Sequence, residues 1–160
     1  MAKLNILCID DQREVLAALK KDLEYFSPIV NLIDCESAGE ADEVLNELDS
    51  EGQLVAVIIC DHIMPGETGV DFLSRLNKDD RFVLTRKLLL TGLATHQDTI
   101  QAINQANLDR YIEKPWEKQD LIDAVKILFT LFIIESDEEY NDYLAFLDQP
   151  TLYRLLRKRV

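Results

Sequence analysis

The chain has 160 residues, of which 48% are hydrophobic and 29% are charged, a balance typical of one folded globular domain and not of a disordered chain. The formal net charge of −13 argues against binding to nucleic acid or to an anionic membrane surface. No apolar run reaches the ~18 residues of a membrane-spanning helix, and the first residues lack the pattern of a signal peptide.

Three cysteines, Cys8, Cys35 and Cys60, lie in or beside apolar runs. They are odd in number and lack the spacing of metal ligands, so we interpret them as small buried hydrophobic residues in a reducing compartment. We therefore expect a cytoplasmic protein.

The first part of the chain alternates between strand and helix patterns. Residues 4–9 are a short apolar run that predicts a strand buried on both faces. Apolar residues at helical spacing follow this strand and stop at Pro28. Residues 29–35 predict a second strand, and residues 37–40 have the spacing of a capping box that opens a second helix.

The same alternation continues to the last helix. Residues 54–60 form the strongest strand pattern, and a Pro-Gly loop at 64–69 and a short helix follow it. Residues 87–90 and 110–113 predict the fourth and fifth strands, and residues 95–98 have the composition of a cap for the helix between them.

Five strand–helix alternations predict a doubly wound, open sheet of parallel strands. The last helix is expected from about residue 117 to residue 134. Residues 135–160 fall outside the alternation, so we divide the chain into a domain at 1–134 and a helical C-terminal extension at 135–160.

Polar side chains follow four of the five predicted strands, at the point where each strand ends. They are Asp10, Asp11, Asp61, Thr91 and Lys114. Each has an ordinary explanation by itself, as a helix cap, a turn residue or a surface charge. Because ligands of open α/β sheets bind beyond the carboxyl ends of the strands, their joint occurrence points to one functional site.

The chemistry of this set is that of phosphoryl transfer. Three crowded carboxylates disfavour full ionisation unless a cation joins them, and Mg²⁺ prefers such oxygen ligands. A carboxylate can act as nucleophile and form an aspartyl phosphate. The magnesium ion, the lysine ammonium and the threonine hydroxyl would then neutralise or bind the phosphoryl oxygens.

This arrangement resembles the receiver domain of two-component response regulators over about residues 3–134. The matching motifs are Asp10-Asp11, Asp61-x-x-Met64-Pro65-x-x-x-Gly69, Leu90-Thr91-Gly92 and Tyr111-x-x-Lys114-Pro115. The resemblance implies a flavodoxin-like fold with a five-stranded parallel sheet in the order 2-1-3-4-5. It also implies a phosphorylation-dependent signalling switch that receives its phosphoryl group from a sensor histidine kinase or a phosphotransfer protein.

The resemblance assigns Asp61 as the phosphoacceptor. It implies that Asp11, Asp61 and the backbone carbonyl of Ile63 bind Mg²⁺ directly, and that Asp10 holds the ion through water. Such a chain is not an enzyme in the usual sense, because it catalyses only its own phosphorylation and dephosphorylation.

The resemblance also implies that Thr91 and Lys114 bind the phosphoryl oxygens, and that the ring of Tyr111 moves inward when Thr91 is drawn to the phosphate. The sequence departs from the family where Ile63 and Leu93 replace residues that are often polar. We expect slow self-dephosphorylation, because neither side chain can orient a water. His62, beside the phosphoacceptor, is predicted to be an exposed loop residue.

Three other classes of protein agree less well with this pattern. A phosphatase of the dehalogenase type uses Asp-x-Asp after its first strand, whereas this chain has Asp10-Asp11-Gln12. An interaction module that no longer accepts phosphate would not need the full set of site residues. A flavin-binding protein is disfavoured because nothing marks a flavin site.

The last helix has two apolar stripes, so it needs two surfaces to pack against. The second stripe consists of Ala124, Ile127, Leu131 and Ile134. The extension carries apolar residues at helical spacing and is long for a simple cover. We therefore predict a symmetric homodimer through the last helix and the extension; the alternative is an extension that folds back on its own helix.

Overall fold

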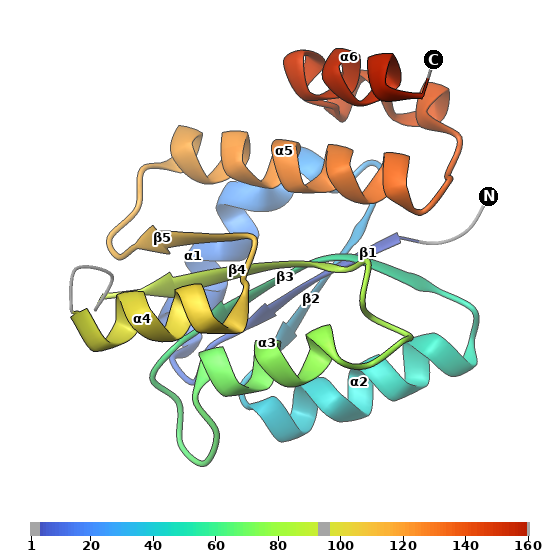
Figure 1. Cartoon of the computed structure of the whole chain (residues 1–160). Helices are drawn as coiled ribbons and strands as arrows, with labels where there is room; N and C mark the ends of the chain where they lie inside the picture. The colour runs from blue at the N-terminus through green and yellow to red at the C-terminus, as the bar shows by residue number, and fades with distance from the viewer. Residues whose placement is uncertain (1–3, 93–96, 160) are drawn as a thin grey trace.

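Five parallel strands form the centre of the molecule, in the order β2-β1-β3-β4-β5 (Figure 1). The computed structural model describes residues 4–92 and 97–159. Its strands are β1 (Leu4–Ile9), β2 (Asn31–Cys35), β3 (Leu54–Asp61), β4 (Arg86–Thr91) and β5 (Arg110–Glu113). The predicted fold class and strand order are confirmed. The inner strands β1, β3 and β4 are almost wholly buried, as continuous apolar runs require.

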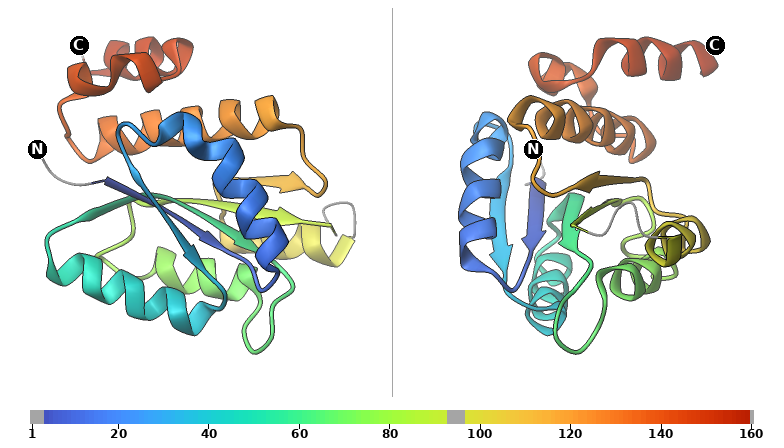
Figure 2. Two further views of the ribbon diagram at one scale, coloured as in Figure 1. Left: turned by 180° about the vertical axis from the view of Figure 1, so that it is seen from behind. Right: turned by 90° about the vertical axis from the view of Figure 1, so that its left-hand side faces the viewer.

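Helices cover both faces of the sheet, as Figures 1 and 2 show. The helical elements are α1 (Arg13–Asp22), η1 (Leu23–Phe26), α2 (Ala38–Ser50), α3 (Gly69–Asn77), α4 (Gln97–Ala106), α5 (Lys118–Glu135), η2 (Tyr140–Phe146) and α6 (Gln149–Lys158). One hydrophobic cluster joins the sheet to α1 and α5, and a second joins it to α2, α3 and α4. The cap predicted at residues 95–98 includes residues outside the described ranges.

The predicted capping box before α2 is shifted by one residue. The hydroxyl of Ser37 accepts a hydrogen bond from the backbone N–H of Glu40, as expected. The carboxylate of Glu40, however, accepts from the N–H of Glu36 and not from that of Ser37. Both side-chain bonds of a capping box are therefore present, but the bond accepted by Glu40 comes from the N–H one residue before the N-cap.

The C-terminal extension folds back on α5, on the side away from the sheet (Figure 2). Tyr143, Leu147 and Leu152 are buried in the same cluster as α5 and the sheet. The hydroxyl of Thr130 in α5 accepts a hydrogen bond from the backbone N–H of Asp148 at 2.8 Å. The second apolar stripe of α5 therefore has a partner within its own chain, which is the alternative that the sequence left open.

The extension also reaches η1, which follows α1. The hydroxyl of Tyr25 donates a hydrogen bond to the carbonyl oxygen of Ala145 at 3.3 Å, and its ring lies against Phe146, with centroids 5.4 Å apart. The extension thus ties η1 to α5. No helix among the described residues is both long enough and apolar enough to cross a bilayer.

Candidate functional site

The ammonium group of Lys114 lies between two carboxylates. Its Nζ is 2.8 Å from Oδ2 of Asp10 and 3.3 Å from Oδ1 of Asp61. Asp10 follows β1, Asp61 ends β3, and Lys114 follows β5. Parallel strands place all three side chains at the same edge of the sheet, although Lys114 is 104 residues from Asp10 in the chain.

Asp11 completes a cluster of three carboxylates with Asp10 and Asp61. One oxygen of each lies within 4.8 Å of one oxygen of each of the others. Asp10 is almost fully buried and Asp11 is exposed, so the cluster is open to solvent on one side. Three convergent carboxylate oxygens are a donor set that fits a hard divalent cation.

Asp10 is fixed by a main-chain hydrogen bond, and the charges of Asp61 and Lys114 depend on burial and on each other. The second carboxylate oxygen of Asp10, Oδ1, accepts a hydrogen bond from the backbone N–H of Gln12 at 2.8 Å. Burial raises the pKa of the Asp61 carboxyl; the neighbouring Asp10 adds to this rise, and Lys114 opposes it. Burial by itself would lower the pKa of Lys114, but its bonds to Asp10 and Asp61 outweigh burial, so the net shift is upward. Lys114 is therefore an ammonium at neutral pH.

Thr91 closes the site on the side of β4. It is the last residue of that strand, and its side chain is buried. Its carbonyl oxygen accepts a hydrogen bond from the backbone N–H of Lys114 at 3.0 Å. The ends of β4 and β5 are thus fixed to each other beside the carboxylates.

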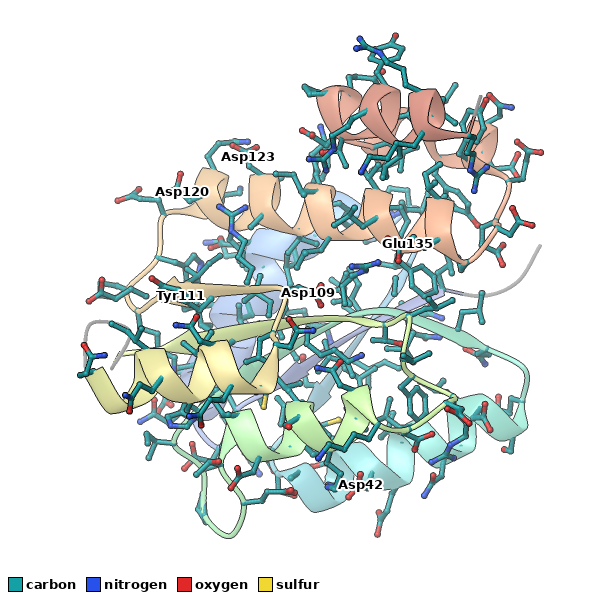
Figure 3. All side chains as sticks on the ribbon, in the orientation of Figure 1. Asp42, Asp109, Tyr111, Asp120, Asp123 and Glu135 are labelled. Atoms are coloured by element: carbon teal, nitrogen blue, oxygen red, sulfur yellow. The ribbon has the colours of Figure 1, made fainter. Side chains whose placement is uncertain are left out.

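Two of the remaining predicted site residues are exposed. Tyr111 is 46% exposed on the edge strand β5, where Figure 3 shows it. The side chain of Ile63 is 55% exposed in the loop after Asp61. Leu93 lies outside the described residues.

His62 differs from its predicted setting. It is half-buried and not exposed, and its Nδ1 has no hydrogen-bond partner among the described residues. Burial lowers the pKa of its imidazole, while Asp61 acts in the opposite direction.

Two contacts near the site were not foreseen from the sequence. Gly69 approaches the main chain of Asp61 so closely that a side chain at this position would overlap it. The indole N–H of Trp116 donates a hydrogen bond to Oδ2 of Asp22, the last residue of α1, at 2.9 Å. The glycine spacing is part of the motif that the sequence displays, whereas nothing in the sequence pairs Trp116 with a residue 94 positions away.

Comparison with known proteins decides the family. The model of the "response regulator receiver domain" family matches residues 6–126. The chain belongs to the response regulator receiver domain family. Receiver domains are phosphoaspartate signalling switches of two-component systems, so the geometry above belongs to a switch of that kind.

The chain is also similar to individual proteins. It is 33% identical over 76% of its length to 23% of the hydrogenase transcriptional regulatory protein HoxA of Cupriavidus necator. It is 26% identical over 79% of its length to 96% of the chemotaxis protein CheY of Pseudomonas aeruginosa. The matched part of the chain thus corresponds to about a quarter of the length of two HoxA relatives, 26% of one and 23% of the other.

Solved receiver domains share the fold. The signal receiver domain of an HD domain-containing protein from Pseudomonas fluorescens Pf-5 superposes with a TM-score of 0.72 at 26% identity, covering 87% of this chain and 96% of that one. A response regulator receiver domain protein from Clostridium thermocellum superposes with a TM-score of 0.66 at 26% identity, covering 81% and 94%. In both cases the superposition includes a smaller share of this chain than of the solved structure.

Proposed function

We propose that Asp61 accepts the phosphoryl group of this switch from a sensor histidine kinase or a phosphotransfer protein. The observation that carries the proposal is the buried Asp61 carboxylate within 3.3 Å of the Lys114 ammonium, beside two further aspartates. A carboxylate oxygen of Asp61 attacks phosphorus and forms a P–O bond. The P–N bond to the donor histidine breaks, and the imidazole nitrogen keeps the electron pair and takes up a proton.

In this proposal Asp11, Asp61 and the backbone carbonyl of Ile63 bind Mg²⁺ directly, and Asp10 acts through water. The bound ion would supply neutralisation of charge on the phosphoryl oxygens. The carboxylate cluster within 4.8 Å supports this donor set. The protein's own chemistry is then limited to its own phosphorylation and dephosphorylation.

Lys114 and Thr91 are proposed to bind two phosphoryl oxygens. Lys114 already faces Asp61 as an ammonium, and the buried Thr91 ends the neighbouring strand. The exposed Tyr111 is proposed to move inward as Thr91 is drawn to the phosphate, which changes the surface that a partner meets. The buried free thiols of Cys8, Cys35 and Cys60 support a cytoplasmic setting for this exchange.

The homodimer through α5 and the extension at 135–160 remains a proposal. The position of the extension leaves two possible arrangements for it. Because the extension covers α5 in its own chain, a dimer would use its outer side chains, such as Leu144 and Tyr153, which are 42% and 58% exposed. Alternatively, two chains would exchange extensions and make the same contacts between them.

Asp61→Asn tests the acceptor. With acetyl phosphate and Mg²⁺, we expect acid-labile phosphate on the parent protein and none on this variant. The matched control is Asp120→Asn, which makes the same chemical change at an exposed position on α5 (Figure 3). Labelling of Asp61→Asn at the parent level, or loss of labelling in the control alone, would contradict the assignment.

A further inference from the structure

The loop that carries Lys114 is tied to α1 by one side-chain hydrogen bond. The indole N–H of Trp116, two residues after Lys114, donates to Oδ2 of Asp22 at 2.9 Å. The indole is half-buried and packs against the cluster that joins α1, α5 and the sheet. A partly buried bond to a carboxylate is stronger than a neutral one and fixes geometry as well as adding stability.

This bond is one of two hydrogen bonds that hold the main chain around Lys114, one at Lys114 itself and one two residues later. In the first, the backbone N–H of Lys114 donates to the carbonyl oxygen of Thr91. Here the chain passes from β5, which ends at Glu113, to α5, which begins at Lys118. The N-cap residue of α5, Glu117, makes no side-chain capping bond, so the start of this helix lacks that usual fixation.

The second of these bonds connects the loop of Lys114 to α1, the element that follows Asp10, one of its two carboxylate partners. Asp22 ends α1, and α1 begins just after Asp10 and Asp11. The bond therefore sets the position of the Lys114 main chain relative to α1 and to Asp10, which lies between β1 and α1. A long side chain that must reach two carboxylates depends on where its main chain is held.

We infer that the Asp22–Trp116 hydrogen bond is a positioning pair for the Lys114 ammonium. The inference rests on the proposed function, in which Lys114 binds a phosphoryl oxygen. Neither residue touches the reacting atoms; their effect passes through the loop. Loss of the bond lets the ammonium move away from the phosphoryl position, while the three carboxylates stay where β1 and β3 place them.

Three variants separate the bond from the packing around it. Trp116→Phe keeps a large buried ring but removes the N–H. Asp22→Ala removes the acceptor, and Asp22→Asn keeps an oxygen that can accept the bond. Glu24→Ala is the matched control, because it removes one acidic charge at an exposed position two residues beyond Asp22.

Two affinities are measured by calorimetry on the full chain: Mg²⁺ alone, and beryllofluoride at saturating Mg²⁺. We expect Trp116→Phe and Asp22→Ala each to weaken beryllofluoride binding about threefold to tenfold, the range of one hydrogen bond. The double variant should be no weaker than either single variant, because both remove the same bond. Asp22→Asn and Glu24→Ala should bind like the parent.

Magnesium affinity distinguishes positioning from a general disturbance of the site. Because Lys114 contacts Asp10 and Asp61, two of the carboxylates proposed to hold the cation, a looser ammonium should leave Mg²⁺ affinity unchanged or higher. Parent-like beryllofluoride binding in both single variants would overturn the inference, as would a parallel loss of Mg²⁺ affinity or additive losses in the double variant. Failure of the parent itself to bind beryllofluoride or to be labelled on Asp61 would overturn the proposed function, and the inference with it.

Discussion

Gly69, the first residue of α3, lies directly against the main chain of Asp61. A Cβ atom at position 69 would lie 2.8 Å from the carbonyl carbon of Asp61, and closer still to its oxygen. The backbone N–H of Gly69 donates to the carbonyl oxygen of His62 at 2.8 Å, so the loop after Asp61 closes tightly on the strand end. The close approach leaves room for glycine alone.

Gly69→Ala should therefore displace the main chain of Asp61. We expect a loss of about 1–3 kcal/mol in the free energy of unfolding, as overpacking usually costs, together with weaker Mg²⁺ binding. Urea unfolding and magnesium titration would measure the two effects. The control is Gly39→Ala in α2, where the new Cβ would lie 3.9 Å from Oγ of Ser37, an ordinary van der Waals contact. Equal stability and equal Mg²⁺ affinity in Gly69→Ala and the parent would show that the strand end tolerates the side chain.

The sequence predicts the fold well because the evidence for it is local. Each buried strand is a short apolar run, and each run toward the site ends in a polar residue such as Asp10 or Asp61. The rule that parallel strands share one functional edge then brings Lys114 to both aspartates, and the structure confirms this meeting. Periodicity and topology together are sufficient for this part of the site.

The features that the sequence does not predict depend on contacts between distant segments. The fold-back of the extension rests on Thr130 meeting Asp148, and on Tyr25 meeting Ala145. Helical spacing shows that a second apolar stripe needs a partner, but not whether that partner belongs to the same chain. The half-burial of His62 likewise depends on the path of the loop and not on local composition.

The sequence also does not predict that a lysine in β4 is fully buried, and this lysine makes stability depend on pH. The side chain of Lys87 has no exposed surface, and its ammonium donates to the carbonyl oxygen of Phe82. Burial lowers the pKa of Lys87 from the usual 10.5 to about 8. The unfolded chain therefore binds more protons than the folded one between about pH 8 and 10.5, so Lys87 makes stability rise with pH across that window.

Lys87→Met should remove this dependence. Between pH 8 and 10.5, the free energy of unfolding of the parent should rise by about 3 kcal/mol relative to that of the variant, on the scale of 1.36 kcal/mol per pKa unit. Urea unfolding of both proteins at pH 7, 8, 9, 10 and 10.5 would measure the difference between them, in which the titration of the other lysines cancels. Lys21→Met, at an exposed position in α1, is the control. Parallel stability curves for the parent and Lys87→Met would contradict the prediction.

Ile63 governs a third prediction, the lifetime of the phosphorylated state. Its apolar side chain is 55% exposed beside Asp61 and offers no hydrogen bond to an attacking water. Introducing Ile63→Asn together with Leu93→Glu should speed loss of the phosphoryl group by at least about threefold, because orienting the water lowers the barrier. Decay of labelled protein would be followed over time. Val83→Asn, equally exposed before β4, should decay like the parent, and an unchanged or slower decay in the double variant would refute the explanation.

The extension provides the last prediction, because it buries apolar surface that α5 would otherwise expose. A chain that ends at Ser136 keeps α5 but loses the buried side chains of Tyr143, Leu147 and Leu152. Full burial of one such side chain contributes about 1.5–3 kcal/mol. We expect the shortened chain to be less stable and to self-associate through the uncovered stripe, whereas the full chain keeps the stripe covered.

A point variant tests the same attachment without removing the extension. Thr130→Val keeps the shape of the side chain but leaves the backbone N–H of Asp148 without its acceptor, at a cost of about 1–3 kcal/mol. Thr130→Ser retains the hydroxyl and should restore most of the stability. Light scattering of the full chain, the shortened chain and both variants, with and without beryllofluoride, then decides the assembly. A dimer of the full chain would confirm the homodimer, whereas a monomeric full chain beside an associating shortened chain would show that the extension acts as a cover. A shortened chain that stays monomeric and as stable as the parent would contradict the role given to these contacts.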